Sequence, residues 1–244
     1  MRYHDALPLL KQLCEDAPQK SEFWLLQANA YIAMGQHERA AEILESANRL
    51  GLLDPEAQLA LADLYYNQQL LDLAIARYDT ALRSGKISAK RMLHCAEALL
   101  LAGRTDMAAR CLSQAREKGI EEPLKAHLLA GRIAEARADL AAAKKAFQAA
   151  LKTDPLCGEA LLALGSLHWR TKDYEQAILT LERACRVEGS EAQALLLLAQ
   201  IEVELDRLAQ AIEHLEAAQE IDPSRRVQRY LEQLRRLARL QPRE

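Results

Sequence analysis

Histidine and cysteine are the side chains that most often bind metals or act as nucleophiles, so their spacing is the first test for catalysis. His94 and His127 lie 33 residues apart. A zinc site would need two further ligands, and Cys95 would point away from its neighbour His94 on a helix. No cysteine has a histidine and an asparagine spaced for a catalytic triad, and no glycine-rich phosphate loop is present. The sequence therefore predicts no metal, no cofactor and no enzymatic activity.

The five cysteines are an odd number without paired spacing: Cys14, Cys95, Cys111, Cys157 and Cys185. This pattern predicts free, at least half-buried thiols in a reducing compartment. The first residues are polar and show no apolar signal segment. No apolar run reaches the roughly 18 residues that a membrane span needs. We therefore expect a cytoplasmic protein without a membrane span.

Charge is unevenly distributed along the chain. The net charge is −3, but residues 225–244 carry seven arginines and two glutamates, a local charge of +5, so the remaining residues carry −8. Such a basic segment could contact an acidic partner, an anionic lipid surface or a nucleic acid. It is also typical of a solvated outer face, which we favour because only Tyr230 accompanies the arginines as an aromatic residue. We expect no nucleic-acid binding.

Small residues recur at fixed spacing and indicate the elements that must position any site. The interval is 34 residues, with one extra residue between the third and fourth repeats. Three positions in each of six repeats, 18 in total, hold only alanine or glycine. They are Ala28, Ala62, Ala96, Gly131, Gly165 and Ala199; Ala40, Ala74, Ala108, Ala143, Ala177 and Ala211; and Ala47, Ala81, Ala115, Ala150, Ala184 and Ala218. A period of this length indicates one stacked supersecondary unit, and a recurrent small residue indicates a close crossing of two helices.

These positions carry a family resemblance. The unit resembles the tetratricopeptide repeat, a helix–turn–helix of 34 residues. Its first-helix pattern is best seen at Trp24, Ala28 and Tyr31, and its closing Asp-Pro at residues 154–155 and 222–223. Between the two alanines of the second-helix pattern stands a larger residue: Leu44, Tyr78, Leu112, Phe147, Leu181 or Leu215.

The resemblance implies an all-α, right-handed α-solenoid. We assign six repeats to residues 21–225, at 21–54, 55–88, 89–123, 124–157, 158–191 and 192–225. Residues 1–20 align only with a second helix and are assigned to an opening half-repeat. Residues 226–244 are assigned to a basic capping helix and tail. Its apolar positions follow helical spacing on one face: Val227, Tyr230, Leu231, Leu234 and Leu237. The expected total is fourteen helices.

Turn residues agree with this division. Gly35 and Gly103 close first helices, where a left-handed cap is easiest for glycine. Thr105, Asp139 and Asp173 lie near the starts of second helices, and we expect these short polar side chains to cap free amides.

The resemblance also implies where a ligand would bind. In this family the first helix of each unit lines a concave groove, with unit positions two, five, nine, twelve and thirteen facing inward. Position five is leucine throughout: Leu25, Leu59, Leu93, Leu128, Leu162 and Leu196. Candidate polar contacts at position nine are Asn29, Asp63, Glu97 and Arg132. Candidate aromatic anchors at position twelve are Tyr66 and Trp169. An apolar strip with a polar edge is typical of a groove for an amphipathic helix or peptide. Alternatively, the leucines pack between first helices and belong to the core.

One subtype of the family binds the terminal carboxylate of chaperone tails through lysine and asparagine at positions five and nine. Here Asn29 is present, but Leu25 replaces the lysine. We therefore do not expect this co-chaperone activity.

The sequence favours a protein–protein interaction scaffold or adaptor that binds a peptide or an amphipathic helix. Three alternatives stay open. The chain could be a chaperone for a secreted or assembly-prone subunit. It could be a regulatory or substrate-presenting module of a longer enzyme. It could also self-associate through an end face.

Overall fold

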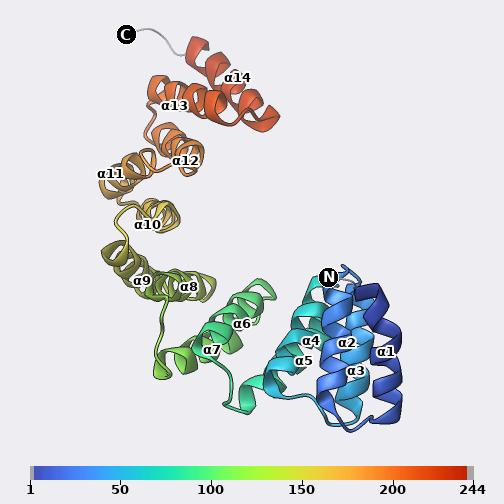
Figure 1. Cartoon of the computed structure of the whole chain (residues 1–244). Coiled ribbons are helices and arrows are strands. Elements are labelled where there is room, and N and C mark those ends of the chain that lie inside the picture. The colour runs from blue at the N-terminus through green and yellow to red at the C-terminus, as the bar shows by residue number, and fades with distance from the viewer. Residues whose placement is uncertain (1–2, 241–244) are drawn as a thin grey trace. The chain divides into compact units, whose positions relative to one another are not determined.

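The computed structural model describes residues 3–240, and the side chains of residues 4–239. Within that range the chain forms fourteen α-helices and no strand, so the protein is all-α (Figure 1). The helices divide into two compact units, Met1–Glu121 and Glu122–Glu244. The boundary between them falls where the repeat spacing contains its one extra residue.

The first unit contains seven helices. The last six form three pairs, and within each pair the two helices pack against one another. The pairs are α2 with α3, α4 with α5, and α6 with α7, while α1 packs on α2. Their bounds are α1 Tyr3–Asp16, α2 Ser21–Ala33, α3 His37–Arg49, α4 Pro55–Asn67, α5 Leu71–Arg83, α6 Ala89–Leu101 and α7 Thr105–Glu117.

The second unit repeats this arrangement. Here α8 pairs with α9, α10 with α11, and α12 with α13, and the last helix packs on α13. The bounds are α8 Pro123–Ala136, α9 Leu140–Thr153, α10 Gly158–Arg170, α11 Tyr174–Ala184, α12 Glu191–Glu204, α13 Leu208–Ile221 and α14 Arg225–Leu240.

The 18 recurrent small positions are all buried, and none of the alanines among them is more than 2% exposed. The two glycines show why size is limited there. A β-carbon on Gly131 would lie 2.5 Å from Cε1 of Phe147, and one on Gly165 would lie 2.7 Å from Cδ2 of Leu181. Phe147 and Leu181 are the large second-helix residues of the same repeats and are fully buried. Each first helix therefore approaches its second helix too closely for a larger residue.

The six first helices of the repeats end in the same way. The residue after the helix cap has a left-handed backbone, with φ of 72° at Gly35 and 73° at Gly103. Four non-glycine residues adopt the same conformation at the equivalent positions: Gln69, Ala138, Lys172 and Asp206. The amide of the following residue returns to the last turn, as Asp139 N does to Ala134 O at 2.9 Å. This is the hydrogen bond of a glycine-type helix cap, and four repeats form it without glycine.

Replacing Ala138 by glycine is expected to raise the free energy of unfolding by about 0.5–1 kcal/mol. Glycine adopts a positive φ without the steric cost of a β-carbon, and this gain exceeds its larger unfolded-state entropy. Urea unfolding followed by circular dichroism measures the effect. The control is Ala136→Gly at the last residue of α8, where glycine should cost up to about 1 kcal/mol. Destabilisation by both substitutions would show that the turn carries no strain.

The predicted caps of the second helices are partly confirmed. Asp139 Oδ1 accepts a hydrogen bond from Ala142 N at 2.9 Å, and Asp173 Oδ1 accepts one from Gln176 N at 3.4 Å. The prediction for Thr105 is wrong, because Thr105 is the first residue of α7 and Arg104 holds the cap position without a side-chain bond. The cap is the residue just before the first helical residue. The chain is already helical at Thr105, so the cap is Arg104.

The last helix covers the end of the second unit. Val227, Leu231 and Leu234 are buried against Ala211 and Leu215 of α13, with Tyr230 half-buried beside them. Leu237, which the periodicity placed on the same face, is 52% exposed. Among residues 3–240, no helix is both long enough and apolar enough to cross a membrane.

Candidate interaction surface

The position-five leucines fall into two classes. Leu59 and Leu93 are 0% and 1% exposed, so the structure places them in the core of the first unit and corrects their prediction as ligand contacts. The other four are half-buried: Leu25, Leu128, Leu162 and Leu196. In the second unit, one side of each such leucine packs against the core while the rest remains accessible. Three of the four accessible leucines therefore belong to the second unit.

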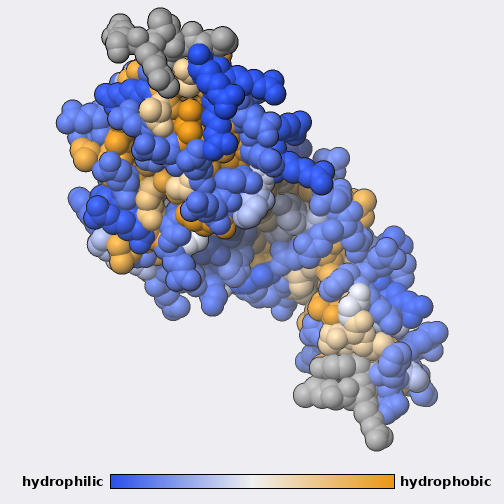
Figure 2. Space-filling model, turned by 90° about the horizontal axis from the view of Figure 1, so that it is seen from above, coloured by the Kyte–Doolittle hydropathy of each residue, from blue (hydrophilic) through white to orange (hydrophobic). Residues whose placement is uncertain are grey.

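On the face that Figure 2 draws, apolar side chains form small groups in place of one large strip. Figure 2 shows a mostly hydrophilic face on which hydrophobic residues are scattered. The other predicted groove residues differ in their accessibility. Asn29 is exposed, whereas the remaining five are half-buried: Asp63, Tyr66, Glu97, Arg132 and Trp169. The accessible part of this surface is therefore made of both polar and apolar side chains.

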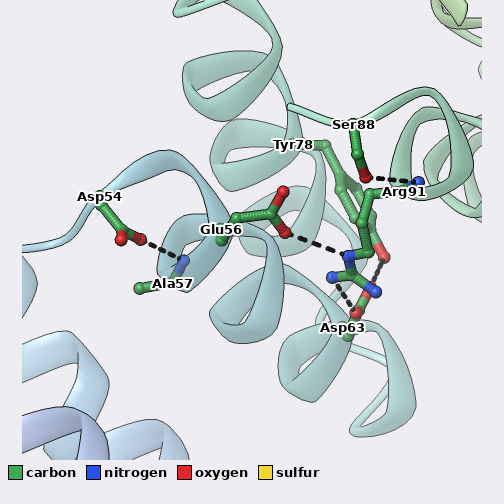
Figure 3. Close-up of polar contacts among 7 residues, drawn as sticks. All are labelled: Asp54, Glu56, Ala57, Asp63, Tyr78, Ser88 and Arg91. Atoms are coloured by element: carbon green, nitrogen blue, oxygen red, sulfur yellow. Dashed lines mark hydrogen bonds and ion pairs between the residues drawn. The ribbon is translucent and has the colours of Figure 1, made fainter. Parts of the chain in front are cut away.

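Asp63 lies at the centre of a polar network that joins three helices of the first unit (Figure 3). Its Oδ1 accepts a hydrogen bond from the Tyr78 hydroxyl of α5 at 2.7 Å, and its Oδ2 accepts one from Nη2 of Arg91 of α6 at 2.9 Å. Nε of Arg91 also lies 3.5 Å from Oε2 of Glu56. Burial and the hydrogen bond to Asp63 raise the pKa of Tyr78 above its ordinary value. Asp63 therefore connects repeats, and both its oxygens are engaged within the chain.

Removing the Asp63 carboxylate is expected to destabilise the first unit. In Asp63→Ala the Tyr78 hydroxyl loses its acceptor and Arg91 loses a charge partner, which should cost about 1–2 kcal/mol. Asp63→Asn keeps an acceptor and should cost less. Thermal unfolding by circular dichroism measures both. Asp72→Ala is the control, because the Asp72 side chain is 99% exposed and exposed ion pairs contribute about 0–1 kcal/mol. Equal losses at both sites would contradict a structural role for the network.

Trp169 is held in place by the helices around it. Its side chain packs against Ala177, Leu181 and Leu198. Hydrogen bonding from the Trp169 indole is the main cause that lowers the pKa of Glu204, and the Tyr174 hydroxyl contributes by donating to Oε2 of Glu204 at 3.1 Å. The ring therefore packs against both α11 and α12 and is only partly accessible.

A cleft of 730 Å³ lies at the C-terminal end of the second unit, between α12 and α14. Leu196 lines it at position five of the sixth repeat, and Gln200 lines it at position nine. The opposite wall comes from α14, and residues at the end of α13 complete the lining. The α14 residues are Arg226, Val227, Arg229, Tyr230 and Gln233, and the α13 end contributes Ala218, Asp222 and Ser224. The cleft thus combines an apolar floor with two guanidinium groups.

The repeat pattern predicts Leu196 as a contact but does not predict the α14 wall, because a basic segment is typical of a solvated outer face. One signal was present. Tyr230 follows Leu196 by 34 residues, so it continues the series of Leu128, Leu162 and Leu196. A capping helix can thus occupy the place of another first helix and carry a half-buried side chain at the equivalent of position five.

Comparison with protein families decides the identity of the repeat. Two tetratricopeptide repeat models match the chain, one at residues 2–64 and the other at residues 128–187 and 177–226. The chain belongs to the tetratricopeptide repeat family. Members of this family serve as protein-interaction modules, and the tetratricopeptide fold here supports such a role with a protein or peptide partner. Comparison with curated proteins gives no match.

Solved tetratricopeptide structures share the fold at low sequence identity. YrrB, described as having an unusual peptide-binding site, matches with a TM-score of 0.66 and 20% identity over 76% of this chain and 95% of that one. PilF of Pseudomonas aeruginosa matches with a TM-score of 0.65 and 19% identity, over 87% of this chain and 96% of PilF. PilW, a type IV pilus biogenesis factor, matches with a TM-score of 0.68 and 20% identity, over 86% of this chain and 98% of PilW. At these identities the likeness concerns the fold alone.

The tetratricopeptide chain offers no cluster of metal-binding groups among its described residues, where no three His, Cys, Asp or Glu side chains converge. The five cysteines are free, with Cys14, Cys95 and Cys111 buried. Burial raises the pKa of Cys95 and of Cys111 to about 12. Since the thiolate is the nucleophilic form, these two thiols are unreactive at neutral pH.

Proposed function

We propose that this tetratricopeptide chain is an interaction scaffold that holds a peptide or an amphipathic helix on the first-helix face of its second unit. The observation that carries the proposal is the series of half-buried side chains at 34-residue intervals: Leu128, Leu162, Leu196 and Tyr230. Each can contact a ligand without leaving its place in the core. Helical and extended peptides anchor through such spaced apolar contacts, while neighbouring polar groups set their register.

Polar residues border this series. Arg132 at position nine of the fourth repeat is half-buried, and Gln200 at the same position of the sixth repeat is exposed beside the C-terminal cleft. YrrB, whose description includes a peptide-binding site, adds support by its similar fold. The proposal gives the chain a binding role and no catalytic one. Its five free thiols suit a reducing compartment such as the cytoplasm.

Site-specific photo-crosslinking tests the proposal. A photo-reactive amino acid is placed at Arg132 or at Gln200 on the first helices. Matched controls carry it at Glu182 of α11 or Glu213 of α13, which are exposed positions on second helices. We expect one partner to be crosslinked from the first-helix positions alone and to be identified by mass spectrometry. Equal crosslinking from Glu182 and Glu213 would place recognition elsewhere and contradict the proposal.

A second candidate is a chaperone for an assembly-prone subunit. The favouring observation is the fold shared with PilW, a type IV pilus biogenesis factor, over most of both chains. A chaperone should form a complex of fixed stoichiometry with one unfolded partner and should keep it from aggregating. Light scattering of that partner, with and without the chain, distinguishes this candidate from a scaffold, which binds folded proteins or short peptides.

A further inference from the structure

The cleft between α12 and α14 has the composition of a specific recognition site. The less accessible part of its lining, called here the apolar floor, consists of the buried Val227 and Ala218 and the half-buried Leu196, Tyr230 and Ala192. Its rim is polar, with Gln200 on α12 and Gln233 on α14. Five of the eleven lining residues are apolar and six are polar or charged, and the volume of 730 Å³ lies within the common range of ligand pockets.

The charges of the cleft are not balanced within the chain. Arg226 forms no ion pair with the described residues. Nε of Arg229 donates a hydrogen bond to the backbone carbonyl of Arg225 at 3.4 Å, within the same helix. Asp222 is the one carboxylate among the lining residues. By contrast, Arg235 does not line the cleft, and it pairs with Glu216 of α13. Two guanidinium groups against one carboxylate leave a positive surplus beside an apolar floor.

Helical spacing places the two arginines that carry this positive charge on one face of α14. Arg226, Arg229, Tyr230 and Gln233 follow the spacing i, i+3, i+4 and i+7, and all four line the cleft. Val227, Leu231 and Leu234 occupy the buried face of the same helix. The two arginines therefore stand beside the apolar floor and can reach carboxylates that flank a side chain inserted there.

We propose that this cleft binds a short acidic segment of a partner protein, with one bulky apolar side chain inserted between carboxylates. The inserted side chain would rest on Leu196 and Tyr230, and its acidic neighbours would pair with Arg226 and Arg229. Guanidinium groups bind carboxylates in a planar, two-pronged geometry. This inference rests on the proposed scaffold function and specifies the partner chemistry at the C-terminal end of that surface.

The test uses the full chain and a fluorescent synthetic peptide, Asp-Glu-Phe-Leu-Glu-Asp. One control peptide replaces every acid by its amide, and another replaces Phe and Leu by Ala. Fluorescence anisotropy is measured at low and at physiological salt. We expect the acidic apolar peptide to bind at least about tenfold more tightly than either control, and less tightly as salt screens the ion pairs.

Charge reversal locates the contact. Arg226→Glu and Arg229→Glu should each weaken binding at least about tenfold. Arg239→Glu makes the same charge change on α14 outside the cleft and should alter the affinity by less than about twofold. All three arginines are exposed, so the variants should fold, and their melting curves check this. Independently of any variant, the side-chain amide NMR signals of Gln200 and Gln233 should shift when peptide is added to the unmodified chain.

Several results would overturn the inference. Equal weakening by Arg239→Glu would indicate unspecific attraction to a basic helix, and so would equal binding of heparin or of the alanine peptide. A concentration-dependent dimer with Gln200 and Gln233 at its contact would assign the cleft to a second copy of the chain. If the peptide fails to bind while crosslinks still form at Arg132, the cleft inference fails and the scaffold proposal stands. Loss of crosslinks at Arg132 as well would reject both.

Discussion

Replacing Phe147 by alanine is expected to lower the free energy of unfolding of the second unit by about 3–5 kcal/mol. The ring is fully buried in a cluster with Ala143, Ala150 and Leu164. It also fills the space left open by Gly131, whose missing β-carbon would lie 2.5 Å from the ring. Deletion leaves a cavity that small neighbours cannot fill, so the loss should lie toward the upper end of this range. Urea unfolding followed by circular dichroism measures it.

The matched control for this change is Phe147→Leu. Leucine occupies the equivalent position in four other repeats, at Leu44, Leu112, Leu181 and Leu215. It keeps most of the apolar volume, so we expect a loss below about 1.5 kcal/mol. A loss below 1 kcal/mol for Phe147→Ala itself would show that the ring is loosely held and that Gly131 has another role.

Replacing Ala177 by leucine should destabilise the second unit by about 1–3 kcal/mol through overpacking. Ala177 is 0% exposed and lies against Leu181, Leu198 and Ile201, so three additional carbon atoms must force α11 away from its neighbours. Thermal unfolding provides the measurement. Ala141→Leu is the control, since Ala141 is exposed on α9 and leucine is also a good helix former. An unchanged melting midpoint for Ala177→Leu would remove the argument that small residues mark helix crossings.

The sequence by itself determined the repeat and its packing. Small residues at 34-residue intervals allow only one close pairing of helices, because steric exclusion at a crossing is local and recurs identically in every unit. The pairing of helices and the buried second-helix residues follow from that pattern, and the all-α class follows from the resemblance to the tetratricopeptide repeat that the pattern carries. The left-handed turn at Gly35 was signalled separately, by the ease with which glycine adopts a positive φ. At Ala138 and Lys172 the same turn exists without the glycine that would have signalled it.

The surface was decided by tertiary contacts. Leu59 and Leu128 occupy the same repeat position, yet one is core and the other is half-buried, because burial depends on how neighbouring helices cover each leucine. Asp63 was predicted as a ligand contact, but Arg91, 28 residues away, and Tyr78 from another helix engage its carboxylate. The cleft required α14 to pack beside α12. Periodicity describes what each unit shares, whereas a binding surface depends on the side chains by which adjacent units differ, and only their packing in three dimensions brings those together.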